Sequence, residues 1–157
     1  CPHRSQPVGN GGFSLRSRRL IDALQDADIR ETQPEDHVIC LDYHDLLVAR
    51  HGIRFAPVDV ASRFAFELTP PKGPTFGFHG FFNFHLAMPD AELQAWLAGA
   101  ERSVLLSMPG RRLLKNLIGA GRHESARLIL DVRAGGSLKQ RLDAFKLRCR
   151  LALRRLR

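Results

Sequence analysis

The residues best suited to bind a ligand stand near the start of the chain, in the segment Gly9-Asn10-Gly11-Gly12-Phe13. Three glycines in four residues allow the backbone to adopt positive φ angles and to approach a ligand closely. Asn10 adds a side chain that both donates and accepts hydrogen bonds. The segment lacks the Gly-Lys-Ser/Thr ending of a P-loop and the spacing of the dinucleotide fingerprint. It is therefore either a ligand-contacting loop of another kind or a tight connection before a helix.

A pair of carboxylates follows at Glu35-Asp36, directly after Pro34. Proline suits the first turn of a helix, and carboxylates are favoured near the positive end of the helix dipole, so the three residues together predict a helix start. A carboxylate that faced a cleft at this point could take a proton from a bound hydroxyl. Otherwise the two acids only stabilise the beginning of the helix.

One histidine, His79, lies between Gly77 and Gly80 in a stretch that also holds five phenylalanines. Small glycines and apolar rings could enclose the imidazole in a dry, close-fitting site. There it could bind a metal ion or a diphosphate, or it could be held by a backbone carbonyl inside an aromatic cluster. We expect the phenylalanines themselves, including Phe81 and Phe82, to belong to the core rather than to stack on a sugar.

The elements that must position these residues alternate between helices and strands in the first half of the chain. Ser17 is a good N-cap for a first helix, whose apolar residues recur at helical spacing. A second helix is predicted over residues 34–51, and Gly52 supplies its stop. Alternating and β-favouring residues predict short strands at 53–56 and 63–67.

From Pro89 onward every signal is helical. Predicted helices begin at Asp90 and then cover residues 101–107, 111–118, 124–132 and 138–156. We therefore expect an α/β region over residues 1–88 and a helical extension over residues 89–157.

The composition is that of an ordinary globular protein, with 157 residues of which 44% are hydrophobic and 25% charged. No apolar run approaches the ~20 residues that a membrane-spanning helix needs. The three cysteines, Cys1, Cys40 and Cys149, show neither zinc-binding spacing nor a disulfide framework, which fits a reduced, intracellular protein. Because the chain does not start with methionine, we expect it to begin inside a longer gene product.

The net charge of +8 is concentrated towards the end of the chain. Residues 1–100 hold 9 Lys and Arg against 12 Asp and Glu, a net of −3, whereas residues 101–157 hold 15 against 4, a net of +11. The last predicted helix, within 138–157, carries an apolar stripe between arginines. It either packs on its own domain or lies on an anionic membrane surface or a protein partner. Nucleic acid is not favoured, because aromatic residues do not interleave with the arginines and no known binding motif occurs.

Four segments in order resemble a bacterial family of unknown function that is grouped with the GT-A-type glycosyltransferases. They are Val8–Ser17, Pro34–Asp36, Gly52–Val58 continued by Arg63–Glu67, and Phe76–Phe84. The resemblance implies the C-terminal portion of a GT-A-like, Rossmann-related α/β fold followed by an all-helical extension. It also implies a nucleotide-sugar-dependent glycosyltransferase.

The resemblance assigns roles to the residues singled out above. In related enzymes a Glu-Asp pair at a helix start supplies the base of inverting transfer, which implies Asp36 as catalytic base and Glu35 as the second choice. Such a base takes the proton of the acceptor hydroxyl as its oxygen attacks the anomeric carbon. The sugar site itself would be shaped by Asn10, Gly11, Gly12 and Phe13.

The resemblance further implies that His79 binds Mn2+ or Mg2+ on the donor diphosphate together with an Asp-x-Asp motif. No such motif precedes the Gly-rich segment, and Asp26-Ala27-Asp28 follows it at a predicted helix end. We expect the nucleotide-binding half of the enzyme to lie before Cys1. On this interpretation the chain carries half of an active site.

The sequence thus predicts part of an enzyme that transfers a sugar from a nucleotide-sugar donor to a glycan or another hydroxyl acceptor. The expected location is the cytoplasm, at the inner face of the membrane if the enzyme builds cell-surface polysaccharide. The alternative is a non-catalytic binding or scaffold protein that docks to a membrane surface or a protein partner through its basic helices.

Overall fold

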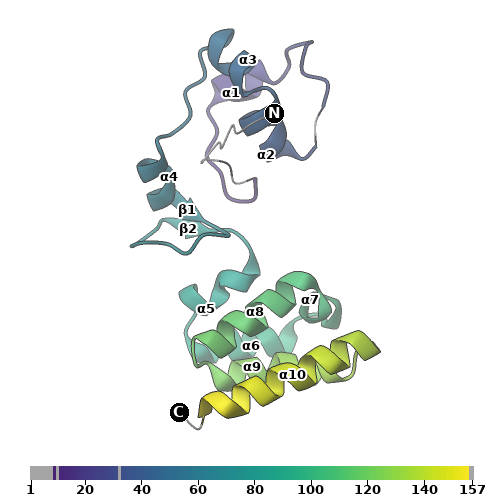
Figure 1. The fold of residues 1–157 in the computed structure, drawn as a ribbon. Coiled ribbons are helices and arrows are strands. Elements are labelled where there is room, and N and C mark those ends of the chain that lie inside the picture. Colours follow the sequence, from purple (N-terminus) through teal and green to yellow (C-terminus); the bar gives the residue numbers. More distant parts are fainter. Residues whose placement is uncertain (1–8, 10, 32, 156–157) are drawn as a thin grey trace. The chain divides into compact units, whose positions relative to one another are not determined.

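The computed structural model describes residues 9, 11–31 and 33–155 and is mostly helical (Figure 1). The chain divides into two compact units, residues 1–79 and residues 80–157. Each unit has its own hydrophobic cluster. The two units are therefore described separately.

The first unit contains short helices and one very small sheet. Its elements are α1 (Arg18–Ala23), α2 (Glu35–His37), a π-helical turn (Val38–Asp42), α3 (His44–Ala49), α4 (Val58–Phe64), β1 (Ala65–Phe66) and β2 (Gly77–Phe78). The predicted N-cap is confirmed, because the Ser17 hydroxyl accepts a hydrogen bond from the amide of Leu20 at 3.2 Å. Five buried residues form the unit's core: Leu20, Ala23, Ile39, Leu47 and Ile53.

The helix predicted over residues 34–51 stops at Gly52 as expected, but it is interrupted rather than continuous. After the π-helical turn the backbone leaves helical geometry at Tyr43, with φ −111° and ψ 13°. Gly52 then adopts a φ of 60°, so that the amide of Ile53 reaches back to the carbonyl of Leu47 at 3.0 Å. A positive φ favours glycine, which confirms Gly52 as the helix stop.

The predicted α/β, Rossmann-related fold is wrong. The sheet consists of β1 and β2 alone, two parallel strands of two residues each, with Ala65 opposite Gly77 and Phe66 opposite Phe78 (Figure 1). A Rossmann-type sheet joins its parallel strands through helices, whereas residues 67–76 form an irregular loop. Residues 53–56 form no strand.

The strand prediction failed for a local reason. Pro57 stands at the N-cap position, and Asp59 lies in the first turn that follows, an arrangement that favours a helix. Helix α4 therefore takes up Arg63 and Phe64, the first half of the strand predicted over 63–67. Only Ala65 and Phe66 remain extended.

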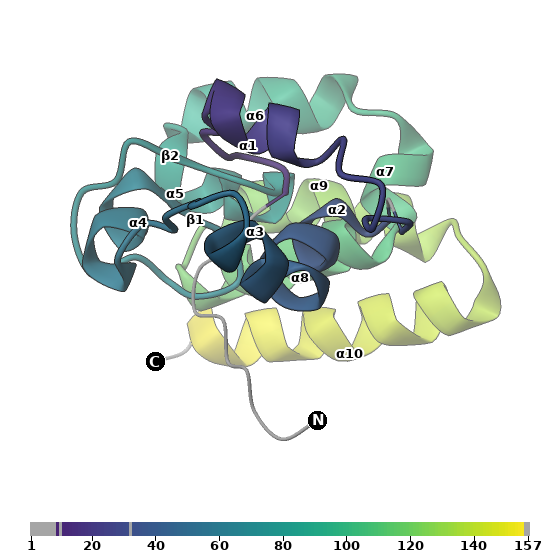
Figure 2. The same ribbon diagram turned by 90° about the horizontal axis from the view of Figure 1, so that it is seen from above.

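The second unit is a bundle of helices around a leucine-rich core. Its elements are a 3-10 turn (Phe81–Asn83), α5 (Phe84–Ala87), α6 (Asp90–Gly99), α7 (Arg102–Leu106), α8 (Met108–Gly119), α9 (His123–Ala134) and α10 (Leu138–Arg155). The helices predicted from Asp90 onward are thus confirmed. Helix α9 contacts α6, α7, α8 and α10, and Figure 2 shows α10 as one unbroken helix.

A buried arginine and the aspartate that it contacts connect four of these helices. Arg133 of α9 is only 4% exposed, and its guanidinium donates to the backbone carbonyls of Leu105 and Leu106 at 3.1 Å. It also contacts Asp143 of α10 at 3.4 Å, and Arg111 of α8 binds the same carboxylate through two hydrogen bonds of 2.6 and 2.7 Å. These bonds hold the pKa of Asp143 below its ordinary value, with the Arg111 bonds as the largest cause. No described helix is long and apolar enough to cross a membrane.

Candidate functional site

The Gly-rich segment is anchored to the rest of the first unit by Phe13. Its ring packs on Phe64 of α4 and on Phe76, with centroid distances of 5.4 and 6.2 Å. A Cβ added to Gly77 of β2 would overlap the Phe13 ring, so the ring lies directly on the strand backbone. Phe13 therefore works as an anchor, and the glycines before it are held over the neighbouring elements.

Two consecutive glycines lie next to the predicted catalytic base, Asp36, and the predicted metal ligand, His79. A Cβ on Gly11 would lie 3.6 Å from the Cβ of Asp36, which is ordinary van der Waals contact. A Cβ on Gly12 would overlap the imidazole of His79, so only glycine fits there without displacing the ring. The segment thus brings Asp36 and His79 to adjacent points of one backbone. Asn10, the fourth residue predicted for the sugar site, lies outside the described residues.

The two adjacent carboxylates have different surroundings. Glu35 forms an ion pair with Arg16, which comes from the end of the Gly-rich segment. Asp36 is half-buried and accepts a hydrogen bond from the amide of His37 at 3.1 Å. The pKa of the nearby Cys40 thiol is raised, chiefly by burial and next by the negative charge of Asp36. Within the part of the chain that the structure describes, an arginine holds Glu35 but not Asp36.

The small sheet places a second acidic residue beside His79. Because Ala65 pairs with Gly77 and Phe66 with Phe78, the next residues along the two strands are Glu67 and His79. The Nδ1 atom of His79 lies 3.3 Å from Oε1 of Glu67, and the amide of His79 donates to the Phe66 carbonyl at 2.9 Å. The two side chains are 44% and 32% exposed, so both are within reach of a ligand.

Glu67 and Arg16 were not predicted as site residues. The signal for Glu67 was its position at the end of a strand, where the following parallel strand delivers His79, but the register is not readable from sequence. The signal for Arg16 was its place in the segment that precedes α1, and its ion pair with Glu35 depends on how that segment folds back. Both are consequences of tertiary structure.

The described side chains around His79 do not form a complete metal site. Among the described residues, no three His, Cys, Asp or Glu side chains lie close enough together to hold an ion. His79 and Glu67 offer two donor groups, whereas divalent ions in proteins take four to six ligands. The described residues therefore do not fit a complete metal centre, and a role of His79 as a metal ligand stays a prediction.

The phenylalanines around His79 separate into two groups. Phe66 and Phe78 lie 5.7 Å apart in the first unit. Phe81 packs on Trp96 in the second unit, and Phe82 is only 7% exposed. The expected core role is confirmed for Phe81 and Phe82 and is wrong for Phe76, which is 80% exposed.

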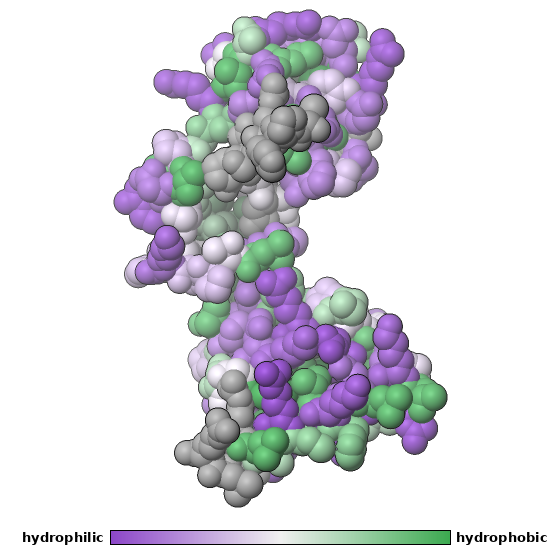
Figure 3. Space-filling view, viewed as in Figure 1, coloured by the Kyte–Doolittle hydropathy of each residue, from purple (hydrophilic) through white to green (hydrophobic). Residues whose placement is uncertain are grey.

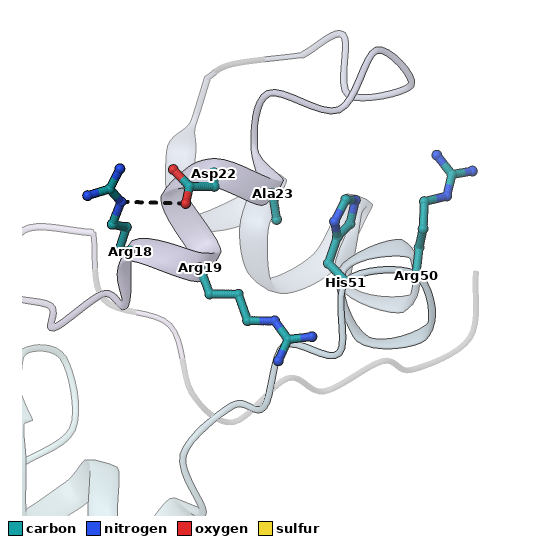
Figure 4. Close-up of a pocket in the computed structure, with 6 residues that line it drawn as sticks. All are labelled: Arg18, Arg19, Asp22, Ala23, Arg50 and His51. Carbon is teal, nitrogen blue, oxygen red and sulfur yellow. Dashed lines mark ion pairs between the residues drawn. The ribbon is translucent and has the colours of Figure 1, made fainter.

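An open pocket of about 580 Å³ lies elsewhere in the first unit, between α1 and the end of α3 (Figure 4). Its lining is rich in cations: Arg18, Arg19, Asp22, Ala23, Arg50 and His51. Most of that charge is already neutralised. Asp26 binds Arg50 and His51 at 2.9 and 2.7 Å, and Asp22 pairs with Arg18. The pKa of Asp26 is strongly lowered, first by the Asp28 amide and then by His51 and Arg50. Asp26 is thus engaged inside its own unit, away from His79.

The family comparison agrees with the extent of this unit. Residues 2–79 match the model of a family described as a protein of unknown function, DUF5672. This part of the chain is thus similar to the DUF5672 family. The match ends at His79, the last residue of the first unit. No curated protein and no solved structure matches the chain.

The predicted membership of a family of unknown function is thereby supported for residues 2–79. The match assigns these residues no activity and no link to glycosyltransferases. Two groups of these residues could take part in a reaction: the half-exposed carboxylate of Asp36 and the imidazole of His79, which lies next to Glu67. Asp36 lies next to Gly11, and His79 lies next to Gly12.

Proposed function

We propose that the region similar to the DUF5672 family is the acceptor-side part of a glycosyltransferase that uses a nucleotide-sugar donor. The observation that carries this proposal is that Gly11 lies next to Asp36 and Gly12 against His79. Glycines let the backbone approach both groups closely, so that Asp36 and His79 lie at neighbouring points of one loop. A base and an imidazole at adjacent points suit a reaction in which one group takes a proton while a negative leaving group departs.

Asp36 serves as the base in this mechanism. Its carboxylate accepts the proton of the acceptor hydroxyl while the hydroxyl oxygen forms a bond to the anomeric carbon of the donor. The bond from that carbon to the diphosphate oxygen breaks, and the nucleoside diphosphate leaves with the electron pair. Attack from the side opposite to the leaving group inverts the anomeric centre.

His79 is positioned by Glu67 rather than free to rotate. The Nδ1 atom of His79 lies 3.3 Å from the Glu67 carboxylate, and Nε2 faces the Gly12 backbone. In the proposed reaction the ring contacts a diphosphate oxygen and offsets part of its charge by a hydrogen bond. Glu35 is held by Arg16 and contributes position rather than proton transfer.

The test measures sugar transfer and donor binding by the full-length protein with a panel of nucleotide-sugars in the presence of Mn2+. Asp36→Asn should lower the rate of transfer about 100-fold or more and leave donor binding unchanged, because a positioned base contributes about that factor. Glu35→Gln is the matched control and should cost less than about tenfold, since its carboxylate acts only through Arg16. Failure to bind any donor, or equal effects of the two substitutions, would overturn the proposal.

A second candidate function is a non-catalytic docking protein. The exposed apolar face of α10 favours this candidate, because such a face can bind another surface without any catalytic site. Donor binding separates the two candidates: a docking protein binds no nucleotide-sugar, and its interaction is insensitive to Asp36→Asn.

A further inference from the structure

Helix α10 has two apolar faces, and only one of them is buried. Ala144, Leu147 and Leu151 are at most 6% exposed and belong to the core of the second unit. At 100° per residue these side chains lie on one side of the helix. A helix that only packed on its own domain would need no other apolar stripe.

The second stripe faces away from that core. Leu138, Leu142, Phe145 and Leu153 are 71%, 55%, 67% and 65% exposed. Helical geometry places them, with the exposed Cys149, inside an arc of about 100° on the side opposite to Leu147. In Figure 3 hydrophobic surface lies beside strongly hydrophilic surface where Figure 1 draws α10. Isolated exposed leucines are ordinary, but an aligned set of four large side chains is not.

Cations line both edges of this stripe. The same geometry puts Lys139, Lys146 and Arg150 along one edge and Arg141 and Arg148 along the other, and all five are exposed. Among the described residues, Arg148 is the only one of the five cations that pairs with an acid, Asp131 of α9. The one acid within the helix, Asp143, is held by Arg111 and Arg133 and does not offset the edges.

We propose that this face of α10 lies on an anionic phospholipid surface. The apolar stripe would enter the boundary between headgroups and acyl chains, and the flanking lysines and arginines would contact lipid phosphates. Long cationic side chains can place their charge at the headgroups while their methylene groups lie along the apolar layer. This proposal does not depend on sugar transfer in the first unit.

Charge complementarity selects this occupant over the others. A second copy of the same face would bring two cationic edges together, which is unfavourable. A nucleic acid would neutralise the cations but leave the apolar stripe in contact with phosphates and water. An anionic bilayer is the surface that matches an apolar centre and two positive edges at the same time.

The experiment is vesicle flotation of the full chain. Vesicles of phosphatidylcholine mixed with phosphatidylglycerol should carry the protein, and vesicles of phosphatidylcholine alone should not. Binding should weaken as salt is raised, because salt screens the contacts of exposed charges. No binding to the anionic vesicles would overturn the proposal.

Two double variants, each with a matched control, separate the contribution of the apolar stripe to vesicle binding from that of its cationic edges. Leu142→Ser with Phe145→Ser should weaken binding to anionic vesicles about tenfold or more, and Leu86→Ser with Met108→Ser, also exposed, should not. Lys146→Gln with Arg150→Gln should weaken it about tenfold, and Arg54→Gln with Lys72→Gln should not, although the net charge falls equally. All of these positions are exposed, so far-ultraviolet circular dichroism should show unchanged helix content.

Other occupants give distinguishable results that count against the proposal. A dimer in analytical ultracentrifugation that Phe145→Ser dissociates would mean that a second copy covers the stripe. Binding to an oligonucleotide that is tighter than binding to vesicles would identify a nucleic-acid face. A fluorophore on Cys149, with Cys1→Ser and Cys40→Ala, should shift to shorter wavelength on anionic vesicles, and an unchanged spectrum would show that the stripe does not enter the lipid.

Discussion

In the second unit fourteen buried residues pack into one core, whereas in the first unit five do so among the residues that the structure describes. Leu93, Leu113, Leu114 and Leu117 of the second unit have no exposed surface at all. Beside its smaller core, the first unit has several ion pairs between side chains of its loops and short helices. The comparison indicates that the second unit is the stable part of the chain and the first unit the part with accessible chemistry.

The polar contacts of the first unit are arranged around its glycines. The ion pair of Arg16 with Glu35 and the contact of Glu67 with His79 are partly exposed, so each adds little to stability. Their effect is to fix the positions of side chains that a ligand can still reach. By contrast, the charged groups of the second unit, Arg133 and Asp143, are turned inward and connect helices.

The largest effect should come from truncating the leucine core. Leu117→Ala should lower the free energy of unfolding of the second unit by about 4 kcal/mol, because it removes a fully buried side chain and leaves a cavity. Leu20→Ala, in the smaller core, should cost about 2 kcal/mol and only in the first unit. Urea unfolding followed by Trp96, the single tryptophan, reports on the second unit, and hydrogen exchange of the Leu47 amide reports on the first.

The same measurement tests whether the two units unfold independently. If Leu20→Ala moves the Trp96 transition as far as Leu117→Ala does, then the two units unfold as one, and the comparison between them fails.

The next largest effect concerns the inward ion pairs of α10. Asp143→Asn should destabilise the second unit by about 3 kcal/mol at pH 6, because Arg133 is left buried without its anion. The pKa of Asp143 is lowered in the folded protein, so its contribution is present above the unfolded pKa of about 4 and is lost as pH falls through the folded value. The Trp96 transition at pH 6 and pH 3 measures this.

The pH dependence supplies the control. Between pH 6 and pH 3 the variant should lose less stability than the unmodified protein does. Asp22→Asn, which removes an exposed pair with Arg18, should change the stability by less than about 0.5 kcal/mol at pH 6. Equal pH profiles for Asp143→Asn and the unmodified protein would contradict the assigned role.

Local signals in the sequence predicted the helices well and the sheet badly. Caps, glycine stops and apolar spacing are properties of neighbouring residues, so the start of α1, the stop at Gly52 and the helices after Asp90 could be read directly. Strand pairing is set by distant residues. The alternating stretch 63–67 favoured a strand, but the helix-start signal of Pro57 and Asp59, which lies before it, carries α4 through Phe64.

For the candidate site, the residue types were predictable and their partners were not. The glycines, Asp36 and His79 stand out by composition, and the structure places Gly12 and His79 in contact. The pairing of Glu67 with His79 depends on the register of β1 and β2, and that of Arg16 with Glu35 on the path of a loop. The sequence carries no local signal for either.

The central claim is that Gly12 lies against His79, and a double-mutant cycle tests it most directly. Gly12→Ala should destabilise the first unit by about 1–3 kcal/mol, because its Cβ must displace the imidazole. In a His79→Ala background the same substitution should cost less than about 0.5 kcal/mol, since the ring is gone and the φ of Gly12 is not positive. Hydrogen exchange of the Leu47 amide gives both values. The account predicts this strong coupling, and equal costs in the two backgrounds would contradict it.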